Sequence, residues 1–510
     1  MQEGRGPGSE FTGWKETQTK LQIGGVVFQA SCYVVLFLTC VIALAKISSH
    51  KARQAILLIA STALYLTWQA WFGGVLLLSI IVNFLLGRWL RAKPHWLPLS
   101  AGVIFNLALL AAFKYVPQLT IHILPSQLQE EGRIALPLGI SYWTFQALSY
   151  LFDQYREEGL DPSFAEFALY VAFFPVTISG PICRLPDMLP QFRTEETTSW
   201  SDIGMGFRRI ATGVLMMQFG KLLGQGILAG DGVVSGFDHA TQWSGTDVWC
   251  LAFGHGLQLF FDFAGYTHIA VGAARALGIM VPENFDRPFA STNPSVFWTR
   301  WHMSLSFWIR DYVFFPLATL RREMWWRNSM LVFSMVLFGL WHKAAFLFLT
   351  WGLYQGILLL AHRMIQQIER RFNWEPPKWW TPLSWCITAM FISLGWILFR
   401  ANSAAQARQM VAALVTPESY ASHFLSTSLY VLIAALAGGY ALVLGIADAM
   451  ARASNAADAE EPQLPSSFVT VIARWRWYWI PAVYALALLF VLMITLTQEG
   501  GVGQMMYRGF

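Results

Sequence analysis

The chain has 510 residues, of which 55% are hydrophobic and only 13% are charged, and its formal net charge is +5. A soluble domain carries about 25% charged residues, so a water-soluble globule could not cover this much apolar surface. The composition excludes a disordered chain, a secreted disulfide scaffold and a soluble nucleic-acid binder, and it predicts a polytopic membrane protein.

Apolar runs that could cross a bilayer follow one another along most of the chain. A hydrocarbon core of about 30 Å needs roughly 20 apolar residues in a spanning helix. Several runs are short or contain Pro or Gly, so we expect an all-α protein with about eleven transmembrane helices plus re-entrant and interfacial helices. A polar N-terminal segment, 1–24, is expected to precede one integral-membrane domain over 25–510. The runs are 25–45, 54–72, 73–90, 99–116, 134–152, 164–182, 208–229, 248–280, 329–342, 344–365, 383–400, 427–449 and 475–497.

Two segments break this pattern. Residues 281–328 contain many charged side chains and are too polar to cross lipid, yet they are rich in tryptophan. Such a segment either lies at the membrane interface or lines a cavity enclosed by protein. Residues 450–468, MARASNAADAEEPQLPSSF, are polar and rich in Ala, Pro and Ser, so we expect a loop there.

His302, in the first of these segments, is a candidate for chemistry. A continuous helix over 298–311 would place His302 about 40° from Trp298 around the helix axis, on the aromatic face. Burial among tryptophans favours the neutral imidazole. The alternative is a core histidine bonded to a backbone carbonyl, because most buried polar groups are merely hydrogen-bonded.

His342 lies between two apolar stretches, in SMVLFGLWHKAAFLFLTWGLYQGILL. Ionisable groups inside membrane segments are functional candidates. Alternatively, Trp341 and Lys343 form an interfacial pair in which the lysine reaches water, and His342 has no role. Asp262, in LQLFFDFAGY, either orients a histidine or pairs with a basic residue such as Arg275.

Several common catalytic motifs are absent from the sequence. It contains no GxxxxGK[ST] loop, no HExxH, no EF-hand loop and no GxSxG elbow. The cysteines form no CxxC pair, so neither a structural zinc site nor a disulfide framework is indicated, and no metal site is predicted.

Longer motifs resemble the membrane-bound O-acyltransferase family, in particular its bacterial branch of alginate O-acetyltransferases and teichoic-acid D-alanyltransferases. The most specific are FDFAGYTHIAVGAARALG and ENFDRPFASTNPSVFWTRWHMSLSFWIRDYVFFPL. The resemblance extends, in the family's order, to LPLGISYWTFQALSYLFD, FFPVTISGPICR, FGLWHKAAFLFLTWGLYQG and LGWILFRANSAAQA. His268 and Lys343 depart from the pattern of this branch.

The resemblance implies an O-acyltransferase that moves an acyl group from a thioester to a hydroxyl. His342 matches the family's intramembrane histidine, which is implied to be the catalytic base. His302 matches the histidine of the upstream RWH motif, which is implied to position the acceptor or to stabilise charge. The residues expected to contact substrate are Trp298, Trp301, Asp262 and Trp341.

The donor implied by the resemblance is acyl-CoA or the phosphopantetheine of an acyl carrier protein, with no tightly bound cofactor. The implied acceptor is an exported polysaccharide or envelope glycan at a bacterial cytoplasmic (inner) membrane, acylated directly or through an exported accessory acyltransferase. The acyl group is expected to be acetyl. A central tunnel, with His342 near its middle and lipid around the helices, would let donor and acceptor meet.

The sequence leaves two alternatives open. One is a D-alanyl transferase. The other is a transporter in which Asp262, Arg275, His302 and His342 form a path for protons or substrate. Transporters commonly contain inverted repeats, and the sequence shows no convincing repeat.

Overall fold

The computed structural model describes residues 31–67, 70–116, 137–156, 159–227, 230–374, 376–377 and 379–457. Within these ranges the chain is all-α, as expected, and extended backbone pairs only in an isolated antiparallel bridge between Phe285 and Trp301. The expected N-terminal segment 1–24 and the expected last span 475–497 lie outside the described residues. The single domain over 25–510 stays a prediction.

The described residues divide into two compact units, each assembled from separate stretches of the chain. The first unit takes in the stretches up to Lys114, from 137 to Phe207, and Gly272–Val281. The second takes in Tyr115 and Val116, most of Arg208–Val271 and the described residues from Pro282 onward. Both candidate histidines therefore belong to the second unit.

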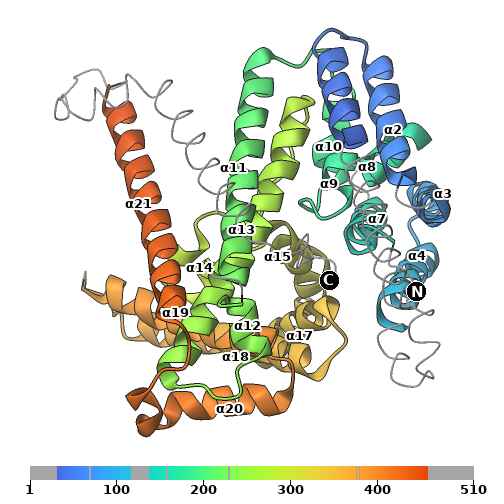
Figure 1. Ribbon diagram of the computed structural model, residues 1–510. Helices are drawn as coiled ribbons and strands as arrows, with labels where there is room; N and C mark the ends of the chain where they lie inside the picture. The colour runs from blue at the N-terminus through green and yellow to red at the C-terminus, as the bar shows by residue number, and fades with distance from the viewer. Residues whose placement is uncertain are drawn as a thin grey trace, which may run out of the picture. The chain divides into compact units, whose positions relative to one another are not determined.

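In the first unit, a largely buried helix packs against two apolar ones. Helix α7 packs on α3 and α4 (Figure 1), and most of its side chains are buried, as is typical of a helix enclosed by its neighbours. Asn83 and Asn106 exchange hydrogen bonds of 3.2 and 2.6 Å between α3 and α4. The helices of this unit are Ser31–Leu44, α2 (His50–Leu66), α3 (Ala70–Ala92), α4 (Trp96–Leu110, continued by a π-helical turn over Ala111–Tyr115), α7 (Ile140–Tyr155), α8 (Phe164–Ala172), α9 (Phe174–Thr177) and α10 (Leu185–Phe192).

The second unit contains both long and short helices. The long helices are α11 (Trp200–Gln225), α13 (Gly245–Ala276), α17 (Met324–His342), α18 (Phe346–Arg371), α19 (Trp380–Arg400) and α21 (Thr427–Ala457). Of α11 and α13, only the residues within Arg208–Val271 belong to this unit. The shorter helices are α12 (Val233–Asp238), α14 (Pro294–Trp298), α15 (Met303–Ile309), α16 (Phe315–Ala318) and α20 (Ala404–Val415). Single turns are 3-10 at Pro288–Ala290 and Pro417–Ala421 and π-helical at Arg310–Phe314.

Glycines let α17 and α18 pack backbone against backbone (Figure 1). A Cβ atom at Gly352 would lie 2.5 Å from the carbonyl oxygen of Met335, and one at Gly339 would overlap the carbonyl oxygen of Phe348. Small residues permit such close approach between helices in membranes. The contact fixes the end of α17, where His342 lies, against the first turns of α18.

Four of the described helices are long and apolar enough to cross a membrane: Trp71–Ala92, Trp96–Tyr115, Trp380–Arg400 and Thr427–Ala449. Ser31–Leu44 is apolar but shorter. All of these fall within or close to the apolar runs recognised in the sequence, and they agree with an integral membrane protein.

Two expectations about local structure are wrong. Residues 298–311 do not form one helix, because α14 ends at Trp298 and α15 begins at Met303. Residues 450–457 are helical and not a loop, since α21 continues to Ala457, and the rest of the expected loop lies outside the described residues. The last turns of α21, MARASNAA, are rich in alanine, whose high helix propensity outweighs the polarity that suggested a loop.

The polar segment 281–328 is partly buried and partly exposed. Trp298, Trp301 and Trp308 are buried inside the second unit. Trp325, at the start of α17, has 57% of its surface exposed. The first part of the segment is therefore enclosed by protein, and the second part reaches the surface of the unit.

Candidate functional site

His342 is the last residue of α17, and only Lys343, Ala344 and Ala345 separate it from α18. The α-helix ends there because Lys343 adopts an extended conformation. The side chain of Lys343 is exposed, whereas His342 is half-buried. The exposure of His342 is that of the residue as a whole, and its ring Nδ1 is buried.

The imidazole of His342 lies among aromatic rings from three helices. From its own helix, Phe338 stacks on it with centroids 5.4 Å apart, and Trp341 lies at 4.6 Å. From α18, Trp351 meets it edge-on at 5.8 Å, and from α19, Phe399 meets it edge-on at 5.2 Å. This environment agrees with an inward-facing histidine and not with a residue turned toward solvent beside Lys343.

His302 lies on a turn between α14 and α15, with a left-handed backbone at φ +44°. A non-glycine residue in this region costs about 1–3 kcal/mol and persists only where surrounding structure enforces it. The carbonyl of His302 accepts hydrogen bonds from Leu305 (3.1 Å) and Ser306 (2.9 Å), so the residue caps α15. The strained turn points a histidine inward where a continuous helix was expected.

The His302 ring is buried, with 2% of its surface exposed. Phe263 of α13 meets it edge-on at 4.7 Å. Among the described residues neither ring nitrogen has a hydrogen-bond partner, so the alternative of a ring bonded to a backbone carbonyl is not what the structure shows. Burial lowers the pKa of the imidazole to about 3, which agrees with the predicted neutral ring.

The two histidines, forty positions apart in the sequence, share neighbours. Phe338 has its centroid 6.5 Å from that of His302 and 5.4 Å from that of His342. Trp341 lies 6.3 Å from His302 and 4.6 Å from His342. The structure therefore brings both predicted histidines and Trp341 to one cluster of rings, which we call the aromatic cluster.

Trp298 belongs to the aromatic cluster, and Trp301 adjoins it. Trp298 contacts Phe338 at 5.2 Å, and its indole nitrogen donates to Oε1 of the buried Gln355 at 3.3 Å. Trp301 lies beside Trp396 of α19 at 5.1 Å. Both tryptophans therefore lie beside rings that surround the histidines or adjoin them. Their contact with a substrate stays a prediction.

Asp262 comes directly before Phe263 on α13, and its carboxylate lies against α11. It packs against Gly220 of α11, where a Cβ atom would overlap its carboxylate. The adjacent residue, Phe263, is the one that meets His302. Arg275, the basic residue suggested as its partner, forms an ion pair with Asp202 at 3.2 Å.

Sequence reasoning missed four rings of the cluster, Phe263, Phe338, Trp351 and Phe399, and it also missed Gln355, the hydrogen-bond partner of Trp298. Trp351 and Gln355 are four positions apart on α18, and both are buried. This spacing places them on one helix face and could have indicated a face turned toward α17. Nothing local in the sequence indicates that Phe399 approaches the same point from α19.

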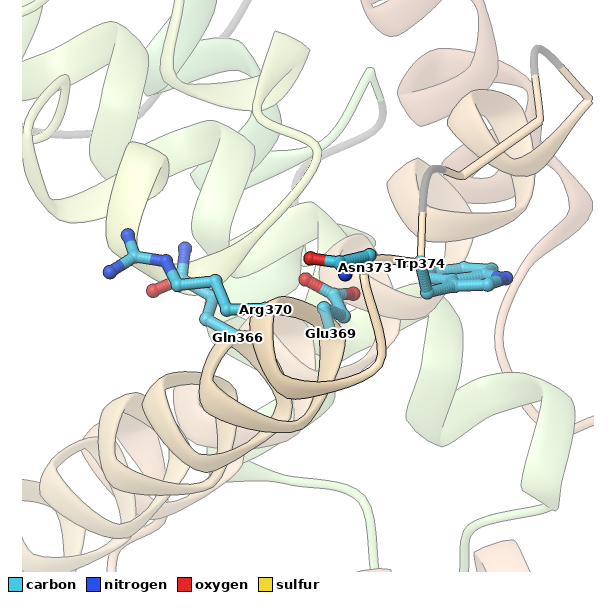
Figure 2. Close-up of a pocket in the computed structure, with 5 residues that line it drawn as sticks. All are labelled: Gln366, Glu369, Arg370, Asn373 and Trp374. Atoms are coloured by element: carbon cyan, nitrogen blue, oxygen red, sulfur yellow. The ribbon is translucent and has the colours of Figure 1, made fainter.

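A pocket of about 300 Å³ lies elsewhere, at the C-terminal end of α18. Figure 2 shows its lining side chains, which are Gln366, Glu369, Arg370, Asn373 and Trp374. They spread outward, with Arg370 and Trp374 pointing in opposite directions (Figure 2). None of them is among the ring neighbours described for the histidines, so this pocket is separate from the aromatic cluster.

Comparison with known proteins places both histidines inside a matched region. The profile of MBOAT, the membrane-bound O-acyltransferase family, matches residues 69–405. A probable alginate O-acetylase of Pseudomonas putida is 33% identical over 409 residues, which cover 76% of this chain and 80% of that protein. A peptidoglycan O-acetyltransferase of Helicobacter pylori is 31% identical over 398 residues, 70% of this chain and 73% of that protein. A teichoic acid D-alanyltransferase of Bacillus subtilis is 32% identical over 279 residues, 51% and 68%.

Proposed function

The chain belongs to the membrane-bound O-acyltransferase family, as its motifs predicted, and on this premise we propose that it acetylates a hydroxyl of an exported polysaccharide or envelope glycan. Acyl transfer is the activity of the family, so no observation favours the transporter alternative. The choice of acetyl rests on relatives: the O-acetylating ones match 76% and 70% of this chain, whereas the D-alanyl transferase matches 51%.

The observation that carries the proposal is the convergence of His342 and His302 on the same two rings, Phe338 and Trp341. Imidazole is the side chain whose ordinary pKa lies closest to neutral pH, which suits it to remove a proton from an alcohol. His342 is the proposed base because it is the more accessible of the two.

In the proposed reaction, the acceptor hydroxyl gives its proton to the imidazole of His342 while its oxygen attacks the thioester carbonyl carbon. The resulting tetrahedral oxyanion collapses, the carbon–sulfur bond breaks, and the departing thiolate takes the proton back from the imidazolium. No acyl-enzyme is needed, because the thioester is already activated. The aromatic surroundings would keep water from the thioester and so limit its hydrolysis.

The proposed role of His302 is to donate one N–H to the oxyanion or to hold the acceptor oxygen. In support, its buried ring has no hydrogen-bond partner among the described residues, so its donor is available. A neutral imidazole carries one N–H and can donate it without becoming charged. A preorganised donor of this kind stabilises charge that develops only in the transition state.

The proposed donor is acyl-CoA or the phosphopantetheine of a carrier protein, reaching the site from the cytoplasm. The exposed Arg321, Arg322 and Arg327 could attract its phosphates if this side faces the cytoplasm. The acceptor would arrive from the opposite side of a bacterial inner membrane through a central tunnel, within a bundle of about eleven spanning helices. An exported accessory acyltransferase is a further proposed partner.

Mass spectrometry of the surface glycan tests the proposal. Cells lacking the gene should lose an acetyl modification that the wild-type gene restores. His342→Ala should fail to restore it at equal abundance in the membrane, because the base is gone. His423→Ala is the matched control, since His423 is exposed and lies on the connection between α20 and α21.

Each result decides a separate part of the proposal. Normal acetylation with His342→Ala would contradict the role of the base. Loss of a D-alanyl group instead of an acetyl group would replace the proposed acyl group. An unchanged glycan in cells lacking the gene would refute the proposed acceptor.

A further inference from the structure

The extended segment that contains Asn284 and Asp286 forms backbone hydrogen bonds to both sides of the turn that carries His302. Before the turn, the Asp286 amide donates to the carbonyl of Arg300 at 3.0 Å. After it, the Met303 amide donates to the carbonyl of Asn284 at 2.9 Å. The two ends of the strained turn are therefore both bonded to the same segment.

The side chain of Asn284 adds to these backbone bonds. Its Oδ1 accepts from the Ser304 hydroxyl at 2.6 Å and lies 3.4 Å from the Ser304 amide nitrogen, which also donates to it. Its Nδ2 donates to the Thr267 hydroxyl of α13 at 3.3 Å. The side chain is fully buried, so the amide connects α13 to the first turn of α15 without help from solvent.

The preceding residue holds the segment from the other side. Glu283 accepts from both terminal nitrogens of Arg209 on α11, at 2.5 and 2.6 Å. Arg209 also donates through Nε to Nδ1 of His268 at 3.2 Å. Such bidentate, charge-assisted bonds are stronger and more directional than neutral ones. Asn284 is therefore a fixed point from which the His302 turn is held.

We infer that Asn284 is a positioning residue for acyl transfer, which holds the turn so that the His302 imidazole faces the aromatic cluster. This role rests on the proposed function of His302. A left-handed histidine persists only when surrounding bonds enforce it, and Asn284 makes bonds from its carbonyl, Oδ1 and Nδ2. Asn284 itself need not touch substrate.

Transfer kinetics provide the first test. Purified protein is given radiolabelled acetyl-CoA and surface polysaccharide from cells lacking the gene. Asn284→Ala should lower kcat by roughly a hundredfold, the loss expected from a misplaced group, with little change in KM for acetyl-CoA. Asn284→Asp keeps an acceptor for Ser304 and should recover part of the rate. The control, Asn83→Ala, removes a buried asparagine of the first unit and should leave kcat unchanged.

A double-mutant cycle separates positioning from general stabilisation. If Asn284 acts through His302, then Asn284→Ala should cause little further loss of rate in a His302→Ala protein, because residues that act as a unit are not additive. Additive losses, or an equal loss of kcat in Asn83→Ala, would overturn the inference.

A measurement without turnover keeps this inference distinct from the proposed function. Diethyl pyrocarbonate modifies accessible neutral imidazoles, and peptide mass spectrometry locates the modified histidine. His302 should be protected in the wild type and in Asn83→Ala but modified in Asn284→Ala. Failure of the wild type to transfer acetyl would contradict the proposed function, although modification of His302 in Asn284→Ala would still show that Asn284 holds the turn. A protected His302 in Asn284→Ala would contradict the positioning role itself.

Discussion

Position 302 makes separate demands on the backbone and on the side chain. The backbone needs a residue that tolerates φ +44°, and the proposed chemistry needs a ring nitrogen. Asparagine tolerates left-handed conformations well, whereas β-branched residues are genuine outliers there. Substitutions can therefore meet one demand without the other.

His302→Asn and His302→Val are expected to differ in stability although both lose the ring. His302→Val should be less stable than His302→Asn by about 1–3 kcal/mol, the usual cost of a disfavoured backbone conformation. Both should lose most of their transfer activity. Thermal unfolding of the purified variants in detergent measures the difference, and equal melting temperatures would mean that the turn is not strained.

The sequence predicted the individual residues of this site better than their arrangement. His302 was expected to face aromatic rings on a continuous helix, and it does face them, but from a turn. The polar contacts of the preceding segment with Ser304 and Thr267 produce this turn. Such contacts join residues distant in the sequence, and helical periodicity contains no information about them.

At the scale of helices, close packing of α17 and α18 determines where His342 lies. Gly352 lies at a backbone contact with α17, and its replacement by a larger residue would force the helices apart. Gly438 of α21, in contrast, has open space where a Cβ atom would be. The two glycines therefore form a matched pair. Gly352 allows a close contact with α17, whereas Gly438 has no such contact with the described residues.

Gly352→Ala should destabilise the protein by about 1–3 kcal/mol, as is typical of overpacking, and should lower transfer because His342 moves with α17. Gly438→Ala should be neutral or stabilising by up to about 1 kcal/mol, since alanine favours helix more than glycine does. Melting temperature and transfer rate of the two variants are compared directly. Equal behaviour of both variants would show that α17 and α18 do not pack as described.

The positions of the helices were more predictable than the way they pack. The apolar runs located α17, α18 and α19 to within a few residues, because a long apolar stretch has few other structures available in a membrane. The approach of Phe399 to His342 depends on how α19 packs beside α18, and that pairing is set by tertiary contacts.

At the scale of the whole molecule, apolar surfaces are stable against hydrocarbon and polar surfaces are stable in water. On α21, the side chains of Leu442 and Val443 are 64% and 63% exposed. Such surfaces would be unfavourable in water, but hydrocarbon covers them at no cost. Ser422, on the loop before α21, is also exposed, but its polar side chain is stable in contact with water and not with hydrocarbon.

Cysteine labelling in open membrane vesicles distinguishes these two solvents. In a protein whose native cysteines are replaced, a charged maleimide should label Ser422→Cys rapidly, because the reactive thiolate forms in water. Leu442→Cys should stay unlabelled, since the charged reagent is excluded from hydrocarbon and the thiol stays protonated there. Both variants should be labelled equally after unfolding in SDS, which controls for the presence of the thiol. Rapid labelling of Leu442→Cys in the vesicles would place this face of α21 against water, and the helix would then border an aqueous passage instead of the lipid.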